Sequence, residues 1–471
     1  MDLCISKKFE TEKGKPCILV NGHKYREYKI LKSVGSIRYR CTNKNCQSSI
    51  YVDNNVTKVL SMLNEHNHEN ISENIVSRQI INSRIKRKCE NDLFTRPNKI
   101  IRQELRSTEN DLQTVHSDIK LWRKSMYDFR KKKLPTIPKS LEESKFQLFN
   151  LRDTLKTNLD EYFCYMEEIS NIVVLTCPTN LDILSRSNHI FADGTFLHSP
   201  KYYDQLYTIH TLQNGFYIPL IYCFLTSKST EYYVDMWRTI IKLCLKLTGI
   251  NVLISLANCN FHFDFEKSAH NAIKECFPNS KIMACRFHLG QSWFRKIQSN
   301  SDLLKEYNSK SEIGLWLKCF FALGFLPENL VGDGFSCLIE NAPTDNFYFS
   351  DYIFDNYVCP EAVFPPFVWA GKPSEEARTT NGPESFHRHY NSQFYTSHPS
   401  IHEVINILLD IQSETYLKIS SIKTNNKNKP RKEQIDKLTF ITETWTKLEK
   451  NEISLLEYLK VMGPKFCATK L

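Results

Sequence analysis

The sequence predicts two folded parts, a small β-rich domain near the N-terminus and a larger α/β domain, joined by a strongly basic helical segment. Three observations predict this organisation. Cysteines and histidines occur at regular spacing in a short region of β-prone residues. The excess positive charge is confined to the stretch that follows. From about Ser140 onward, strand-like runs and amphipathic helical runs follow one another.

The length and composition are typical of a folded chain with several domains. Of the 471 residues, 41% are hydrophobic and 12% aromatic, which is too much apolar material for a disordered chain. Apolar runs such as 217–225 are shorter than the roughly 18 residues of a membrane span, and no secretory signal is visible. The 16 cysteines therefore indicate reduced thiols and metal ligands, and we expect no membrane partner.

The first part, residues 1–72, is predicted to bind zinc. Cys41 and Cys46 have four residues between them, and His66 and His68 follow after a gap of 19. Zinc takes four such ligands at tetrahedral angles, and side chains two apart on an extended strand point the same way. A domain this small also needs a metal to supplement its core. Possible substitutes with less regular spacing are Cys4, Cys17 and His23.

The second part, residues 73–140, carries the positive charge. Between Ser77 and Lys139 there are 17 Lys and Arg against 7 Asp and Glu, a balance equal to the +10 of the whole chain. Apolar residues recur near helical spacing and are interrupted at Pro97, which predicts short helices with basic faces. Contact with DNA is one interpretation, and a solvated linker or a nuclear-import signal is the alternative. The candidate contact residues are Arg84, Lys86, Arg87 and Lys88.

The third part, residues 141–471, predicts an α/β core. Strand-like runs occupy 189–197, 205–212 and 217–225, and Asn214-Gly215 is a strong hairpin signal. Helical periodicity covers 232–247, and another strand is predicted over 251–256. Three antiparallel strands, a helix and a further strand are the element order of an RNase H-like core with helices on both faces of the sheet.

Acidic residues stand at informative places in this core. Asp193 interrupts an apolar strand, where a carboxylate needs a hydrogen bond or a metal ion. Asp264 lies in the loop that begins a helix. Each also has a plain structural interpretation, as a turn residue and as a helix N-cap. Cys285 and His288 follow on the next predicted strand, and Glu384 opens a long helical region.

The N-terminal part has a second pattern besides its metal-ligand spacing. It consists of Phe9, Leu19, Tyr25, Tyr39-Arg40-Cys41 and Glu65-His66-Asn67-His68. In these residues the chain resembles a FLYWCH-type zinc finger, a β-rich relative of the WRKY DNA-binding fold. One departure is that the family's tryptophan before the first cysteine is Tyr39 here. The resemblance implies DNA binding and, less often, protein contact.

The C-terminal part carries a series of motifs from about Asp182 to Leu417. They are Ala192-Asp193-Gly194-Thr195-Phe196, Tyr203 to His210, Pro219-Leu220, Asp264-Phe265-Glu266, Cys285 to Gln291, and Arg378 to Asn381 with Glu384 and His387. In these motifs the chain resembles the MULE family of transposases, related to the Mutator group. The resemblance implies a transposase core with an α-helical insertion at about 295–375. It also implies an acidic triad of Asp193, Asp264 and Glu384, with Glu375 and Glu376 as rivals for the third acid.

The triad implies Mg²⁺ or Mn²⁺ as the catalytic cofactor. Three carboxylates can hold two hard cations about 3.5 to 4 Å apart on either side of a phosphodiester. For Cys285 and His288, zinc ligation, DNA contact and packing are open. Because no second pair of ligands accompanies them, a structural or DNA-positioning role is favoured.

The main hypothesis is a nuclear DNA transposase that binds terminal inverted repeats and catalyses divalent-metal-dependent strand cleavage and transfer. Double-stranded DNA would be its partner, zinc its structural cofactor, and a homo-oligomer its form during synapsis. The alternative is a domesticated transposase that acts as a sequence-specific DNA-binding regulator without cleavage. A plain RNase H-type nuclease is the third hypothesis, weakened by the finger and the insertion.

Overall fold

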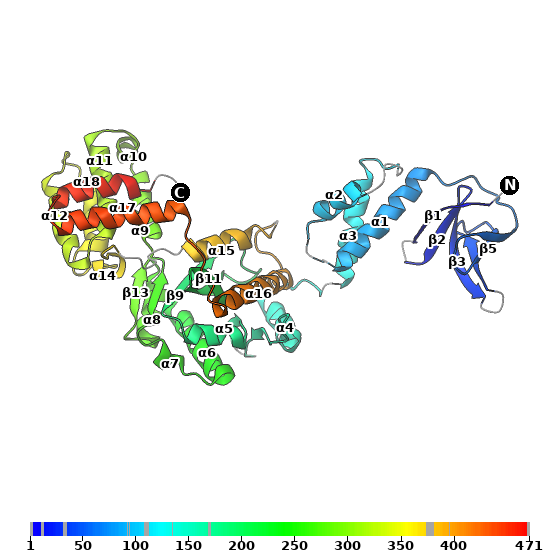
Figure 1. Ribbon diagram of the computed structural model, residues 1–471, viewed down its shortest axis with the longest axis horizontal. Helices are drawn as coiled ribbons and strands as arrows, with labels where there is room; N and C mark the ends of the chain where they lie inside the picture. Colours follow the sequence, from blue (N-terminus) through cyan, green and yellow to red (C-terminus); the bar gives the residue numbers. More distant parts are fainter. Residues whose placement is uncertain are drawn as a thin grey trace. The chain divides into compact units, whose positions relative to one another are not determined.

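The computed structural model describes residues 3–10, 14–31, 35–91, 93, 95–107, 113–133, 135–167, 171–373, 381–394 and 396–468. The chain divides into two compact units, Met1–Ile137 and Pro138–Leu471 (Figure 1). No helix among these residues is long and apolar enough to cross a membrane.

Unit 1 begins with a six-stranded antiparallel sheet in which each strand pairs with the next along the chain. This agrees with the small β-rich domain predicted near the N-terminus. Tyr25 and Tyr39 are 1% and 2% exposed and pack in its core, so Tyr39 fills the interior with an aromatic ring. The strands are β1 (Ile5–Glu10), β2 (Pro16–Val20), β3 (His23–Leu31), β4 (Ser36–Cys41), β5 (Ser49–Asp53) and β6 (Val59–Leu63).

The described part of unit 1 also contains the helices α1 (Glu73–Asn91), α2 (Pro97–Ser107) and α3 (Asp118–Lys133). Trp122 and Met126 of α3 are buried against α1 and α2, so the basic segment has its own apolar core. Helix α1 also packs on the sheet, through Val76 and Ile80 against Leu19. The predicted break at Pro97 is confirmed, because proline suits the first turn of a helix.

Unit 2 contains a seven-stranded sheet in the order β13-β12-β9-β10-β11-β8-β7. Strands β9, β10 and β11 pair antiparallel, whereas β12 runs parallel to both β9 and β13. The predicted hairpin is confirmed, with positive φ angles of 50° at Asn214 and 79° at Gly215. The strands are β7 (Cys164–Tyr165), β8 (Val173–Leu175), β9 (His189–Thr195), β10 (Gln205–Gln213), β11 (Phe216–Leu225), β12 (Asn260–Phe263) and β13 (Lys281–Ala284).

Helices cover both faces of this sheet. Successive residues of β11 point to opposite faces of the sheet, as the two-residue period of a strand requires. Cys223 packs with α5 and α6 on one face, and Tyr222 packs with α4 and α16 on the other. The helices around the sheet are α4 (Leu141–Leu151), α5 (Pro178–Ser185), α6 (Thr230–Thr248), α7 (Val252–Ser255), α8 (Lys267–Cys276), α9 (Arg286–Gln298), α15 (Asn381–Asn391) and α16 (Ile401–Lys423).

The strand predicted over 251–256 is wrong, because this run forms the short helix α7. The Asn251 side chain accepts a hydrogen bond from the Leu253 N–H and caps the helix. Ile254 is 76% exposed, so this apolar run is not a buried strand.

A helical subdomain follows α9 and precedes α15. It contains α10 (Ser301–Asn308), α11 (Glu312–Cys319), α12 (Val331–Glu340), α13 (Tyr348–Ile353) and α14 (Pro366–Trp369). Trp316, Phe320 and Phe321 are buried and belong to the core of this subdomain. The C-terminal helices α17 (Lys432–Glu449) and α18 (Leu455–Phe466) pack on the same subdomain (Figure 1). The Tyr458 hydroxyl donates to the Phe325 carbonyl at 3.0 Å.

Candidate functional site

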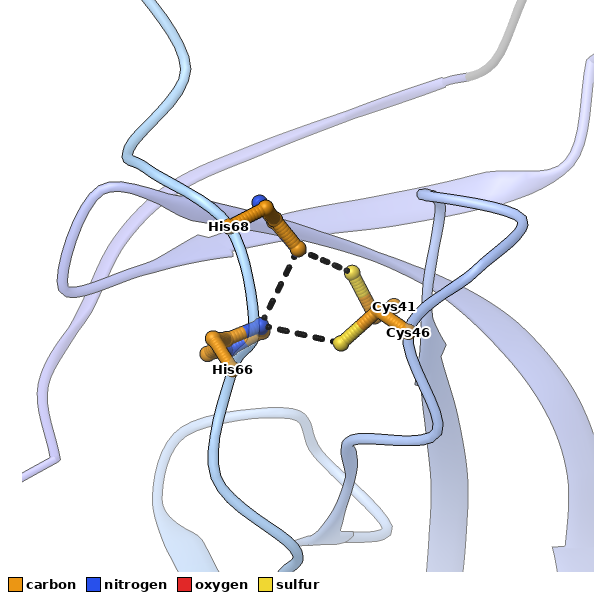
Figure 2. Close-up of side chains that lie close together, drawn as sticks. All are labelled: Cys41, Cys46, His66 and His68. Carbon is orange, nitrogen blue, oxygen red and sulfur yellow. Dashed lines mark hydrogen bonds between the residues drawn. The ribbon is translucent and has the colours of Figure 1, made fainter.

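Cys41, Cys46, His66 and His68 come together in the finger, with all four ligand atoms within 4.8 Å of one another (Figure 2). Cys41 ends β4, Cys46 lies in the turn that follows, and both histidines come after β6. Cys41 Sγ lies 3.2 Å from His68 Nε2, and Cys46 Sγ lies 3.4 Å from His66 Nδ1. Among the described residues, the possible substitutes Cys4, Cys17 and His23 do not belong to this group.

The opposite nitrogen of each of these histidines has an oxygen partner. Tyr25 Oη lies 2.7 Å from His66 Nε2, and the Glu69 carbonyl oxygen lies 2.8 Å from His68 Nδ1. These contacts orient His66 Nδ1 and His68 Nε2 toward the thiols, as outer contacts do in metal sites. Burial, and then the neighbouring His23 and His68, lower the pKa of His66 to about 4, so the ring is neutral and able to ligate.

The basic candidates in α1 make ion pairs within unit 1. Arg84 and Lys88 lie 3.6 and 2.8 Å from the Glu104 carboxylate, which is 3% exposed in its side chain. Arg87 pairs with Glu10. Three of the four candidates, Arg84, Arg87 and Lys88, are therefore engaged with acids of the same unit, and these contacts stabilise its packing.

Asp193 lies in the central strand β9, opposite Thr208 of β10. The Gly194 N–H donates to Asp193 Oδ1 at 2.8 Å, and His387 Nδ1 lies 3.1 Å from Asp193 Oδ2. Thr208 Oγ1 lies 2.9 Å from both His387 Nε2 and His210 Nε2. The Thr208 hydroxyl donates to the Asp193 carbonyl at 3.2 Å, so Thr208 connects both histidines to the strand that carries Asp193.

Asp264 directly follows β12, the parallel neighbour of β9. The register pairs Phe261 with Ile190 and His262 with Phe191, so two further steps bring Asp264 beside Asp193. Burial, and then the Asp193 carboxylate, raise the pKa of Asp264 to about 6, although positive His288 opposes this. Two carboxylates in such a position need a positive partner if both are to be ionised at neutral pH.

Glu384 lies in the first turn of α15 and faces a Cys–His pair. Its Oε1 is 3.7 Å from His288 Nε2, and ligand atoms of Cys285, His288 and Glu384 all lie within 4.8 Å of one another. The prediction that Cys285 and His288 lie on a strand is wrong. Cys285 is the residue after β13 and occupies the N-cap position of α9, and His288 lies in the first turn of that helix.

Helix α15 approaches β11 closely enough to require a glycine. A Cβ atom built on Gly382 would lie 2.0 Å from the Tyr217 ring. Residue 382 is therefore limited to glycine by this contact, which fixes how the helix that carries Glu384 and His387 sits against the sheet.

Two domain families match this chain. The FLYWCH zinc finger domain matches residues 9–68, and the MULE transposase domain matches residues 189–292. This protein carries an N-terminal FLYWCH zinc finger and a MULE transposase domain. Its function is therefore transposase-related. No curated protein matches the chain.

The MULE match contains Asp193, Asp264, Cys285 and His288, whereas Glu384 lies beyond it. Asp193 and Asp264 influence each other electrostatically, and both act on His288, the neighbour of Glu384. Among the described residues, the three acids do not form one ligand group within 4.8 Å. The rival acids Glu375 and Glu376, and the motif residue Arg378, lie outside the described residues.

Sequence reasoning missed several neighbours of these acids in the MULE domain. Glu266 accepts a hydrogen bond from the Tyr233 hydroxyl at 2.9 Å and is electrostatically coupled to Asp193. Lys228 acts on both Asp264 and Glu266. The spacing of Glu384 and His387, three residues apart on one helix face, was a signal that could have indicated the His387 contact with Asp193.

Proposed function

We propose that this protein is a DNA transposase that binds the terminal inverted repeats of its element and catalyses divalent-metal-dependent strand cleavage and transfer. The FLYWCH finger and the MULE domain support DNA as the partner. A protein that acts on genomic DNA would work in the nucleus, and pairing two DNA ends would require a homo-oligomer.

The strand order supports an RNase H-like fold for the MULE domain. Five strands lie in the order β11-β10-β9-β12-β13, with the first three antiparallel and the last two parallel to β9. The chain thus uses a hairpin-linked meander and two helical crossovers to place β9 at the centre. Carboxyl ends of parallel strands meet at one edge, where sites of α/β sheets commonly form.

The observation that carries the proposal is the position of Asp193 and Asp264 near the carboxyl ends of adjacent parallel strands. The raised pKa of Asp264, caused by burial and Asp193, supports a cation there, because a divalent ion removes the repulsion between two carboxylates. Hard oxygen ligands of this kind suit Mg²⁺ or Mn²⁺.

We assign Asp193, Asp264 and Glu384 as the residues that would hold these cations. When bound, the cations would supply charge for the attacking and leaving oxygens of a phosphodiester. The protein's own part is orientation. Gly194 and His387 each contact one oxygen of Asp193 and thereby fix the plane of its carboxylate.

We further propose that Cys41, Cys46, His66 and His68 hold one structural zinc ion. Two thiols and two imidazoles within 4.8 Å of one another are the donor set and spacing that tetrahedral zinc requires. The folded finger would then contact DNA together with the basic segment, where Arg84, Lys86, Arg87 and Lys88 remain candidates.

The test is incubation of the full-length protein with duplexes that carry the inverted repeats flanking its coding region, with Mg²⁺ or Mn²⁺. We expect strand cleavage that Asp193→Asn abolishes without loss of DNA binding. Asp235→Asn is the matched control, because Asp235 is an exposed acid on α6 that pairs only with Arg238 among the ion pairs found. Binding without cleavage under either cation would overturn the proposal and favour the regulator.

A further inference from the structure

Cys285, His288 and Glu384 form the second cluster of potential metal ligands among the described residues, and the first is the finger. The Cys–His pair is placed by the junction between β13 and α9, and Glu384 is brought to it by α15. Glu384, which is distant in the sequence, thus supplies a third ligand that the Cys-x-x-His pattern does not contain.

The three side chains are arranged for one ion. Cys285 is 2% exposed, and the side chains of His288 and Glu384 are 23% and 22% exposed. Ligand atoms of all three lie within 4.8 Å, and zinc ligands about 2.0 to 2.3 Å from a shared ion are separated by comparable distances. Cys285 and His288 are three residues apart at a helix start, so both reach the same side.

An unpartnered nitrogen adds a second observation. His288 Nδ1 is buried and has no hydrogen-bond partner among the described residues. Buried polar atoms are normally satisfied, so an ion bound by Nδ1 would satisfy this atom, whereas an ion bound by Nε2, which lies 3.7 Å from Glu384 Oε1, would not.

We propose that Cys285, His288 and Glu384 bind a borderline-soft divalent cation, with zinc as the natural occupant, at the edge of the acidic centre. A thiolate and an imidazole select such an ion over Mg²⁺, which prefers oxygen ligands throughout. Three protein ligands leave a fourth position open, the arrangement of zinc sites that receive water or a substrate oxygen. This differs from the Mg²⁺ or Mn²⁺ assigned to Asp193 and Asp264, although Glu384 contributes to both.

The experiment counts zinc in the full-length protein, purified from zinc-supplemented cells without added chelator, by mass spectrometry of the metal. We expect about two zinc ions per chain in the wild type, one in the finger and one at Cys285. Cys285→Ser and Cys46→Ser should each hold about one, and the double variant none.

Two further variants complete the zinc measurement, one as a control and one as a second test. Cys259→Ser, which changes another buried cysteine of the same sheet region, should keep about two zinc ions. Glu384→Gln covers the case in which Cys285→Ser fails to fold, and it should weaken zinc retention during dialysis about tenfold while circular dichroism stays unchanged.

Cobalt substitution provides an independent readout. Co²⁺-loaded Cys46→Ser protein should show a thiolate-to-cobalt absorption band that disappears when Cys285→Ser is added. A wild-type protein with a single zinc ion, or a Cys285→Ser protein with two, would overturn the proposal. Asp193→Asn should keep both zinc ions, so metal content and DNA cleavage can fail separately.

Discussion

The Tyr25 hydroxyl fixes which nitrogen of His66 faces the thiols of the finger. Its oxygen lies 2.7 Å from His66 Nε2, which leaves Nδ1 toward Cys46. We predict that Tyr25→Phe lowers zinc affinity about tenfold, because loss of an outer contact lets the ligand ring rotate. Competition with a chromophoric zinc chelator measures this affinity.

Tyr39→Phe is the matched control for this prediction. Tyr39 is buried in the same sheet core, but it makes no hydrogen bond to a ligand histidine among the described residues. Equal zinc affinity in the two variants would mean that Tyr25 acts only through packing.

His210 connects the pH dependence of stability to the buried hydrogen-bonded chain of unit 2. Burial, and then His387 and Lys418, lower the pKa of His210 well below its usual 6.5. The unfolded chain therefore binds a proton below about pH 6.5 that the folded chain does not, and stability decreases as pH falls. Well above pH 6.5, His210 is neutral in both the folded and the unfolded chain, so it contributes no pH dependence to stability there.

We predict that His210→Gln reduces this loss between pH 6.5 and 5.5 by up to about 1.4 kcal/mol per pH unit. Urea unfolding followed by tryptophan fluorescence at several pH values measures it. Buried His270, whose pKa is lowered to about 4, should leave part of the slope in place. His389→Gln, at an exposed position of α15, is the control, and an unchanged slope in His210→Gln would contradict the prediction.

At the scale of elements, Glu104 ties α2 to α1 through Arg84 and Lys88. Removing both cations takes two ion-pair partners from a buried carboxylate, so Arg84→Ala with Lys88→Ala should cost about 1 to 3 kcal/mol of unfolding free energy. Adding Glu104→Gln should restore part of this loss, because the buried negative charge that these cations balanced disappears. Chemical denaturation followed by circular dichroism measures all three proteins.

The matched control is Lys131→Ala with Lys132→Ala, which removes two exposed cations from α3. This pair should leave stability within about 0.5 kcal/mol of the wild type. If it destabilises unit 1 as much as the α1 pair does, then total charge rather than the Glu104 contacts governs stability.

Features that depend on nearby residues were predicted correctly from the sequence more often than features that depend on long-range packing. The break at Pro97 and the Asn214-Gly215 hairpin depend on nearby residues and were correct in place, and the four side chains from Cys41 to His68 come together as their spacing indicated. The run 251–256 was wrong because a short apolar stretch does not distinguish a strand from a capped helical turn.

The candidate sites show the same division. The approach of Glu384 to Cys285 and His288, and of His387 to Asp193, depends on how α15 packs on the sheet. No local period encodes that packing. The contribution of α17 and α18 to the helical subdomain was missed for this reason as well.

At the scale of the whole molecule, the division into two compact units predicts two unfolding transitions. Cys46→Ser should lower the thermal midpoint of unit 1 alone, since Cys41 and Cys46, the proposed zinc ligands, belong to its small sheet core. Differential scanning calorimetry of the full-length protein resolves the two transitions. A parallel shift of both would mean that the units unfold cooperatively.

The close contact between Gly382 and Tyr217 makes the position of Glu384 depend on a glycine that has no reactive side chain. One added methyl group at position 382 would push α15 outward and carry Glu384 and His387 away with it. Every acidic residue would still be present in the gene. Under the proposed function, a protein that keeps all three acids but changes Gly382 would lose cleavage, so position 382 is as informative about activity as the acids themselves.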